Sequence, residues 1–314
     1  MNMTHSLGHD GEQPAGEYAR ERRPVAVASL SAPDLTNKNF LTFDIEEWYH
    51  VNYEGIDSSG YRGTPTNLES LVDRLIEICG QRGVKTTCFI LGEIGRQTPS
   101  VVKKLHAHGH EIASHGFAHA NVYPMAPDQF RADLKLSCEI LEHLTGEKVL
   151  GFRAPSFSIR RDTLHWFYPV LESQGLRYSS SVFPGQTFLY GIPDFPEHVH
   201  YPVVNGATQK ILEFPVPRME FLGKQMGLYF RLFPAWMIRR KIRTDNRIGK
   251  PVILYLHPRE IDVDQPRLPL QGFEKLIHYW GIRKCEDKLH AVLRNMPGRF
   301  CAFRDILPPC DLAG

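Results

Sequence analysis

The chain lacks any hydrophobic run approaching 18 residues, so its sequence predicts no membrane-spanning helix. It also lacks a charge excess. Its 37 Lys and Arg residues against 35 Asp and Glu residues leave a net charge of +2, which excludes the electrostatic signature of a nucleic-acid-binding protein. Its six cysteines include no Cys-x-x-Cys pair, which argues against a disulfide framework. We therefore expect free thiols in a reducing compartment, with Cys79 and Cys88 buried as small hydrophobic side chains.

The composition is that of an ordinary globular protein, with 42% hydrophobic and 23% charged residues among 314. Residues 1–38 are polar and contain Gly, Pro and Glu, and we interpret them as a disordered tail before one domain, residues 39–307. The pair Arg22-Arg23 precedes only the short apolar run 25–28, which is too short for an export signal. The expected location is therefore the cytoplasm.

Strand-like and helical patterns alternate along the predicted domain. Apolar runs of strand length occupy residues 40–44, 86–91, 110–114, 149–153, 176–182, 211–215 and 252–257. Amphipathic patterns predict helices that begin at the capping-box sequence 66–69 and at Ser100, and helices over 127–144 and 161–174. This alternation favours parallel strands with right-handed crossovers, and the spacing fits a closed barrel and an open sheet equally well.

A long segment, residues 185–226, breaks this rhythm and is rich in proline. Long loops in compact domains are commonly functional, so one interpretation is a set of loops over a substrate cleft. A surface excursion without a role is an equally good interpretation.

Residue types that carry chemistry follow the ends of the predicted strands. The first apolar run ends in Asp44, Glu46 and Glu47. About 70 residues later come His115 and His119, whose spacing would place both imidazoles on one face of a helical turn. Two His and one carboxylate are a common ligand set for a catalytic divalent metal, and a spare carboxylate beside them can act as a general base. The pattern indicates metal-assisted hydrolysis.

Two further strand ends complete the pattern. Arg153 ends the predicted strand 149–153 and precedes an Ala-Pro pair, and His257 ends the apolar strand 252–257. Four strand-to-loop junctions in order thus carry a catalytic residue type, and it is this combination, more than any single motif, that is specific.

From about residue 40 to about residue 303, the chain resembles the NodB-like polysaccharide deacetylases, carbohydrate esterase family 4. Its first motif, residues 44–50, and its last, residues 257–262, look closest to the branch associated with exopolysaccharide loci, PEP-CTERM/XrtA systems and a DUF3473 region. The resemblance implies an α/β fold, an irregular (β/α)7 barrel with a long loop-rich insertion. It also implies an active site at the carboxyl ends of the strands.

The resemblance also implies a metal centre. It gives Asp44 the role of general base and makes Glu46, His115 and His119 the metal ligands. Glu47 is the rival of Glu46, because the spacing of this motif varies among subfamilies. Zinc fits two His and one carboxylate, and cobalt, manganese or iron would also fit.

Further roles implied by the resemblance surround this centre. Arg153 is expected to pair with the base, because a nearby cation keeps a carboxylate ionised and oriented. Pro155 would stiffen the turn that aims backbone donors at the oxyanion. Many relatives carry Tyr where this chain has Ser156, so only a backbone role is expected there. Trp48 and Tyr49 would either stack on sugar rings or belong to the core.

His257 matches the family's general acid, a task that suits an imidazole because its pKa lies near neutrality. In relatives an Asp tunes this His, whereas the matching region of this chain has Ser179. Three outcomes are open. Glu260 or Asp262 replaces that Asp, or His257 is tuned less strongly, or the activity is reduced or lost.

The implied function is metal-dependent removal of N-acetyl groups from an amino-sugar polysaccharide or its lipid-linked precursor. The implied setting is exopolysaccharide or cell-envelope biosynthesis. One alternative is a deacylase of a small non-sugar amide. Another is a carbohydrate-binding pseudoenzyme, which need not hold stoichiometric metal.

A possible membrane contact lies late in the chain. Residues 228–238 are densely apolar and aromatic, and four basic residues follow closely: Arg239, Arg240, Lys241 and Arg243. Such a segment suits peripheral contact with an anionic membrane, here the inner membrane face. In the alternative, the apolar part covers the barrel and the basic part is its solvated end. Pro234 favours this alternative, because it interrupts any long amphipathic helix.

Overall fold

The structure is a computed structural model of the chain. It describes the following residues: Pro33, 35–53, 55–185, 191–216, 220–221, 224–225, 229–294, Met296 and 300–309. Most of the tail expected over residues 1–38, Cys310 and parts of the insertion 185–226 lie outside the described residues.

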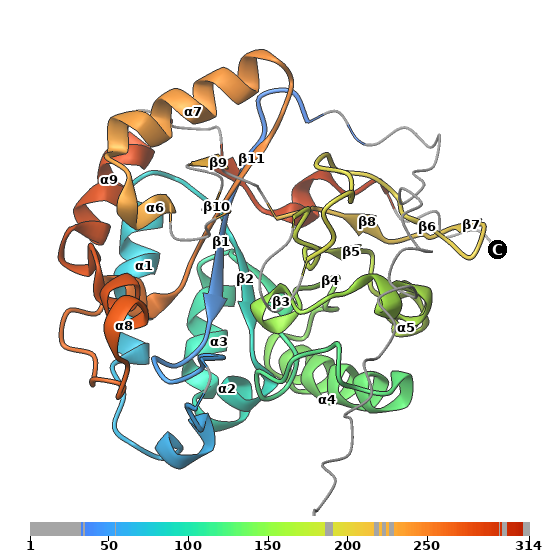
Figure 1. Cartoon of the computed structure of the whole chain (residues 1–314), viewed down its shortest axis with the longest axis horizontal. Coiled ribbons are helices and arrows are strands. Elements are labelled where there is room, and N and C mark those ends of the chain that lie inside the picture. The colour runs from blue at the N-terminus through green and yellow to red at the C-terminus, as the bar shows by residue number, and fades with distance from the viewer. Residues whose placement is uncertain are drawn as a thin grey trace, which may run out of the picture.

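A curled parallel sheet forms the centre of the fold (Figure 1). Its strands lie in the order β11-β1-β2-β3-β4-β5-β8, and every neighbouring pair is parallel. The strands are β1 Asn39–Ile45, β2 Thr87–Ile90, β3 Glu111–Ser114, β4 Gly151–Phe152, β5 Tyr178–Ser179, β8 Leu212–Glu213 and β11 Val252–Leu256. β12, Phe300–Cys301, pairs with the start of β1. The expected irregular barrel of seven strands is confirmed, as a half-barrel whose sheet begins at β11 and ends at β8.

Helices cover the outside of the sheet (Figure 1). Those between successive strands are α1 Leu68–Gly80, α2 Gly92–Gln97, α3 Pro99–Ala107, α4 Pro127–Thr145 and α5 Leu164–Ser173. The later helices are α6 Tyr229–Leu232, α7 Ala235–Arg247, α8 Gly272–Tyr279 and α9 Cys285–Arg294, and α7 packs beside α9. Two short hairpins lie in the insertion: β6 Val203–Val204 with β7 Ala207–Thr208, and β9 Glu220–Phe221 with β10 Lys224–Gln225.

The capping box expected at the start of α1 does not form. The helix begins at Leu68 with Asn67 at the N-cap, and no side chain caps it. The Leu68 N–H donates a long hydrogen bond of 3.4 Å to the Thr66 hydroxyl, while the Glu69 carboxylate accepts from Ser100 on α3. The position of α1 follows instead from its apolar face, whose expected members are all buried: Leu68, Leu71, Val72, Leu75, Ile76 and Cys79.

Strands β4, β5 and β8 are shorter than their apolar runs predicted, with two residues each. At the carboxyl ends of these strands, hydrogen bonds to side chains take the place of the backbone hydrogen bonds between strands. The Ala154 N–H donates to the Ser181 hydroxyl at 3.0 Å, and the Ser181 N–H donates to the Glu213 carboxylate at 2.9 Å. These bonds satisfy buried backbone donors without a paired strand and let the chain turn towards the barrel axis.

Aromatic side chains fill the inside of the barrel. Along β1, Phe40, Thr42 and Asp44 alternate with residues that pack under the helices, as strand geometry requires. The Phe40 side chain meets a buried cluster that includes Phe89, Ala113, Tyr178, Phe214 and Phe303. This cluster fills the barrel below the level of Asp44, so the strand ends above it are left for a site.

Gly151 shows how tightly two strands approach. A Cβ atom added there would lie 1.8 Å from Cζ of Tyr178, a buried ring whose hydroxyl donates to Glu111. We expect Gly151→Ala to lower the free energy of unfolding by about 3 kcal/mol or to prevent folding, because the packed ring has no room to move. Denaturant titration measures this. In Gly80→Ala the methyl meets nothing within 4 Å, so this control should match the wild type or exceed it slightly. Equal midpoints for both variants would contradict the argument.

The thiols agree with the expectation from the sequence as far as the structure describes them. Cys79, Cys88, Cys138, Cys285 and Cys301 are free, and Cys79 and Cys88 are fully buried. Among the described helices, none combines the length and the hydrophobicity needed to cross a bilayer.

Candidate metal centre and catalytic cleft

The carboxyl ends of β1, β3, β4 and β11 meet at one cleft with a volume of about 280 Å³. Parallel pairing brings these ends to the same edge of the sheet, although they are far apart in sequence. Six of the residues predicted from the sequence line this cleft: Asp44, Glu46, His115, His119, Ser156 and His257.

Glu46, His115 and His119 form a candidate metal centre. One donor atom from each lies within 4.8 Å of the other two. The Oε2 atom of Glu46 is 2.9 Å from Nε2 of His119 and 3.8 Å from Nε2 of His115. Donors bound at about 2.1 Å to a tetrahedral metal would be about 3.4 Å apart, which lies between these two distances.

The chemistry of these donors fits a divalent cation. His115 donates from Nδ1 to the Arg153 carbonyl oxygen at 2.8 Å, which turns the lone pair of Nε2 towards Glu46. Burial lowers the pKa of His115 to about 4, so its imidazole stays neutral, as a metal ligand must. The Oε2 atom of Glu46 is buried without a well-formed hydrogen bond, an acceptor that a cation would satisfy.

Glu46 is an ionised carboxylate in this cluster. Burial alone would raise its pKa, but the neighbouring imidazoles of His119 and His257 outweigh burial and lower the pKa well below the usual range. Glu47 behaves differently. Burial raises the pKa of Glu47 to about 7, and its partner is the hydroxyl of Thr66. Of the two rivals, Glu46 therefore lies with the imidazoles.

The pair His115 and His119 does not lie on a helix, so that expectation from the spacing was wrong. Residues 115–120 form a loop in which Gly116 and His119 both have left-handed backbone conformations, with φ of 77° and 58°. Hydrogen bonds from distant segments hold the loop. Its carbonyls accept from the backbone of α2, and the Phe117 N–H donates to Asp133 at 2.9 Å. The imidazole rings of His115 and His119 lie with their centroids 5.5 Å apart. Such a strained conformation in a non-glycine residue is typical of functional sites.

Asp44 is held by Arg153, as the resemblance implied. An Nη1 atom of Arg153 lies 2.6 Å from Oδ1 of Asp44 and 2.9 Å from the Thr42 hydroxyl. The guanidinium is buried over the ring of Phe89, 4.1 Å from its centroid. The guanidinium fixes the orientation of the carboxylate and leaves Oδ2 of Asp44 facing the cleft.

His257 faces both carboxylates. Its Nε2 atom is 3.6 Å from Oε1 of Glu46 and 3.9 Å from Oδ2 of Asp44. Its Nδ1 atom lies 3.6 Å from Oε2 of Glu260, which also accepts from the His257 backbone N–H. Burial would raise the pKa of Glu260, but the guanidinium of Arg231, 2.7 Å away, lowers it to about 2. The Glu260 carboxylate beside the His257 imidazole is therefore ionised at neutral pH.

Glu260 is thus the residue in place to do what an Asp does in relatives. The Asp262 carboxylate instead faces the amide of Asn67 at 3.4 Å. Ser179 bonds to the Ser181 hydroxyl at 2.9 Å inside the barrel wall. The sequence could not decide between Glu260 and Asp262, because the backbone of the short turn 258–261 determines which of the two carboxylates faces His257.

We expect Glu260→Gln to lower the rate of the hydrolysis expected at this cleft by about 10- to 100-fold, an effect typical of a partner that orients a reacting group. The alkaline limb of the pH–rate profile should move to lower pH, because the carboxylate that favours imidazolium is gone. Steady-state rates across pH measure both. Asp262→Asn, which removes the other open candidate, should leave the profile unchanged. A shift in that variant but not in Glu260→Gln would reverse the assignment.

The turn after Arg153 supplies a possible oxyanion donor. Pro155 is followed by Ser156 and Phe157, both with left-handed φ, at 52° and 53°. Within the described residues the turn uses the N–H groups of Phe157 and Ser158 and leaves that of Ser156 without a backbone acceptor. The Ser156 side chain lines the cleft and accepts from the amide of Asn52, which fixes the turn.

Trp48 and Tyr49 do not face the cleft, so their candidate role in sugar stacking was wrong. Their side chains are only 5% and 2% exposed, and they pack with Val51, Leu268 and Leu270. The other interpretation, a place in the core, is the one the structure supports.

Sequence reasoning gave no role to His50, which lines the cleft beside His119, with ring centroids 5.7 Å apart. Its Nδ1 atom accepts from the Glu47 N–H at 3.0 Å, and burial lowers the pKa of His50 to about 3. The neutral ring therefore carries its proton on Nε2, which is buried and has no hydrogen-bond partner among the described residues. The sequence feature that could have indicated a place in the cleft is the position of His50 at the end of the first motif, residues 44–50. Other cleft residues without a predicted role are Asn52, Tyr53, Tyr255 and Arg259.

Family models match two adjacent segments of the chain. The model described as polysaccharide deacetylase matches residues 39–178, and the model described as a domain of unknown function, DUF3473, matches residues 180–307. The first segment supplies Asp44, Glu46 and both candidate imidazole ligands, and the second supplies His257.

Individual proteins match parts of the chain. A peptidoglycan deacetylase-like protein of Gibberella zeae is 34% identical over 121 residues, 38% of this chain and 35% of that protein. A peptidoglycan-N-acetylglucosamine deacetylase of Bacillus cereus is 31% identical over 93 residues, 30% of this chain and 34% of that protein. The chain thus spans about a third of the length of these relatives.

One solved structure extends the likeness of fold to nearly the whole chain. It is assigned as a polysaccharide deacetylase of Mycobacterium smegmatis and matches with a TM-score of 0.58 at 19% identity. The match covers 89% of this chain and 90% of that one.

Proposed function

We propose that this chain is a NodB-like polysaccharide deacetylase, which removes N-acetyl groups from an amino-sugar glycan by metal-dependent hydrolysis; the match of residues 39–178 to the polysaccharide deacetylase model supports this. The observation that carries the proposal is the cleft itself. Glu46, His115 and His119 converge there, with Asp44 on one side and His257 on the other. This is the full set of groups that amide hydrolysis needs.

The proposed roles follow from the geometry. Asp44, whose Oδ1 is fixed by Arg153, accepts at Oδ2 a proton from the attacking water. His257, across the cleft, gives a proton to the leaving amine nitrogen, and Glu260 orients its ring. The Ser156 N–H, in the turn stiffened by Pro155, donates to the acyl oxygen as it gains charge. A bound divalent metal would supply the acidified water and polarise the acyl carbonyl.

We infer zinc as the resident metal, held by Glu46, His115 and His119, because two imidazoles and one carboxylate suit it. Cobalt, manganese and iron suit the same donors, so reconstitution with each is part of the test.

The proposed substrate is an amino-sugar polysaccharide or its lipid-linked precursor, in exopolysaccharide or cell-envelope assembly. The similarity of residues 44–50 and 257–262 to that branch of the family supports this setting. The match of residues 180–307 to DUF3473 supports it further. The free thiols of the described cysteines support a cytoplasmic location, at the inner membrane face if the chain contacts lipid.

Acetate release from a panel of N-acetylated amino-sugar oligomers, with metal-reconstituted protein, tests the function. Release that depends on added metal supports the proposal. Release only from small amides would favour the small-amide deacylase. Failure to hold stoichiometric metal, together with binding of the oligomers without hydrolysis, would favour the carbohydrate-binding pseudoenzyme and overturn the proposal.

A further inference from the structure

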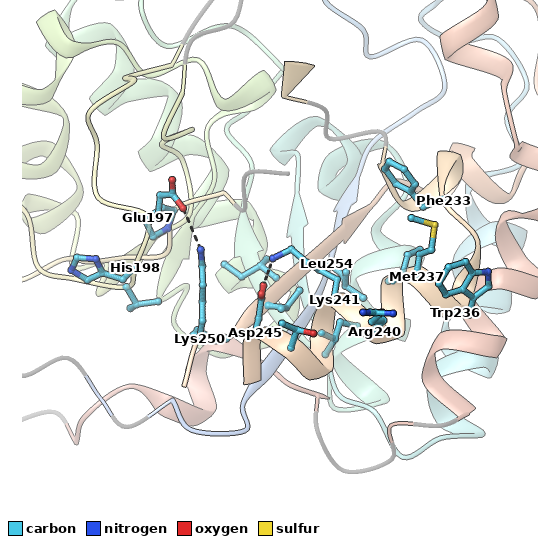
Figure 2. A pocket seen from close by; sticks show the side chains of 18 residues that line it. Glu197, His198, Phe233, Trp236, Met237, Arg240, Lys241, Asp245, Lys250 and Leu254 are labelled. Carbon is cyan, nitrogen blue, oxygen red and sulfur yellow. Dashed lines mark hydrogen bonds and ion pairs between the residues drawn. The ribbon is translucent and has the colours of Figure 1, made fainter. Parts of the chain in front are cut away.

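A second cavity, larger than the catalytic cleft, lies between α7 and β11 (Figure 2). Its volume is about 420 Å³, within the range of about 300–1,000 Å³ that small-molecule sites occupy. It shares no lining residue with the cleft, but β11 serves both, with Val252–Leu254 at the cavity and Tyr255 at the cleft. Leu254 is three residues before His257, about 10 Å along a strand.

The cavity runs along the outermost strand of the half-barrel. Val252 and Leu254 belong to the core under the helices, whereas Ile253 belongs to the barrel interior, so the cavity reaches both faces of β11. Its opposite wall includes Val199 and Pro215, which follows β8. The cavity therefore occupies the opening between the two ends of the described sheet, where a closed barrel would have another strand.

Most of the apolar part of the remaining lining comes from α7 and the residues just before it. Ile238 and Ile242 are buried there, and Phe233 and Met237 lie at the same end of the cavity as Trp236 (Figure 2). The lining fits a hydrocarbon chain.

Charge surrounds the cavity on one side. Helix α7 has five basic residues and one acid, a net charge of +4, against +2 for the whole chain: Arg239, Arg240, Lys241, Arg243, Asp245 and Arg247. Lys241 pairs with Asp245, and Lys250 pairs with Glu197 at the far end of the cavity. Arg240 and Arg243 are exposed and form no ion pair with a described carboxylate. They are left to meet an anion outside the protein.

Trp236 places an exposed aromatic ring at the cavity. Its side chain is 58% exposed and borders the cavity beside this basic face. Exposed indole rings next to cations are typical of protein surfaces that meet a lipid interface.

The structure also answers the question that the sequence left open for residues 228–238, of which Leu228 lies outside the described residues. Phe230 and Ile238 are buried, so this part of the segment does cover the barrel. Pro234 interrupts the helical segment as expected, because α6 ends at Leu232 and α7 begins at Ala235 with Pro234 as its N-cap. Phe233, Trp236 and Met237 of this segment line the cavity, which the sequence pattern did not suggest.

We propose that this cavity binds the hydrocarbon chain of a phosphate-bearing lipid, with the phosphate at Arg240. An apolar cavity with a cationic rim on one side matches an amphiphile with one anionic end. The inference goes beyond the proposed function and does not rest on it, because the cavity and the cleft have separate linings.

Isothermal titration calorimetry on the whole chain tests the proposal, with farnesyl phosphate and dodecyl phosphate below their micelle concentrations. Both are expected to bind, and inorganic phosphate alone should bind at least about 100-fold more weakly, because the chain supplies most of the buried apolar area. Preference for farnesyl phosphate would identify a prenyl carrier as the source, and equal binding would identify any single-chain lipid. No binding of either probe by the wild type would overturn the proposal.

Two variants locate the site. Met237→Trp fills the cavity and should weaken both probes by about tenfold or more. Arg240→Glu should weaken the phosphates but leave farnesol binding unchanged. Arg247→Glu makes the same charge change on α7 away from the cavity lining, so it should bind like the wild type. Wild-type affinity in both Met237→Trp and Arg240→Glu would overturn the site.

Acetate release from soluble oligomers is measured in parallel on each variant. It should stay unchanged, which also shows that Met237→Trp remains folded. If this variant does not fold, Arg240→Glu, which changes an exposed side chain, decides alone. Lipid binding without acetate release would leave the lipid site intact and count against the deacetylase function only.

Discussion

His115→Ala and His119→Ala are each expected to lose the bound metal and about 1000-fold or more of the deacetylase activity. Each variant removes one of three donors that converge within 4.8 Å, and two donors hold a catalytic metal poorly. A metal that polarises a carbonyl contributes several kcal/mol to transition-state stability, and about 4 kcal/mol corresponds to about 1000-fold in rate. Elemental analysis of the purified variants and acetate release measure the two losses.

Both variants should stay folded, because these side chains lie above the aromatic cluster that fills the barrel. Thermal unfolding checks this. His108→Ala is the matched control, since His108 is an exposed imidazole at the end of α3 and should keep full metal and full activity. Full metal occupancy in either His115→Ala or His119→Ala would contradict the ligand assignment.

Asp44→Asn is expected to keep the metal and to lose activity on the order of 100-fold or more, the loss typical of a missing general base. The amide keeps the size of the carboxylate and can still accept from Arg153, but it does not take up a proton from water. Its kcat/KM and its metal content, measured on the same preparation, test both halves of the statement.

The same substitution leaves the buried guanidinium of Arg153 without its counter-charge. A loss of about 3 kcal/mol in folding stability is expected from breaking such a pair, so assays belong well below the melting temperature. Glu46→Gln is the contrasting variant and should lose metal. If Asp44→Asn loses the metal while Glu46→Gln keeps it, the roles of base and ligand are the reverse of those proposed.

The positions of the strands, and of the residues at their ends, could be predicted because each is encoded locally. In β1 the alternation of Phe40, Thr42 and Asp44 with apolar neighbours fixes both the strand and the direction of the acid. Parallel pairing then gathers the strand ends without any further information. That is why the cleft contains the predicted acids and imidazoles.

What could not be predicted depends on distant partners. The backbone of His119 is left-handed because the loop is tied to α2 and to Asp133, contacts that no local pattern contains. Trp48 is buried by Leu268 and Leu270, which come more than 200 residues later, so its aromatic character alone fitted two roles.

Glu260 could not be separated from Asp262 in the same way. The two lie at a short turn, and the partner that fixes Glu260 is Arg231, a residue 29 positions away beside α7. The cavity at α7 could not be predicted from the sequence either. Its walls come from both ends of the sheet, and no single segment of the sequence shows that these ends lie close together.

The pairing of β1 with β11 decides how this chain could be divided by genetic means. Five residue pairs join the two strands, from Asn39 with Val252 to Phe43 with Leu256. A polypeptide ending at residue 178, where the deacetylase match stops, would expose one long edge of β1 and would lack the His257 imidazole. Two co-expressed halves would regain hydrolysis only by fragment complementation, with β11 added in trans. The DUF3473 segment is therefore a structural part of the same sheet as the deacetylase segment, and it also supplies one wall of the proposed catalytic cleft.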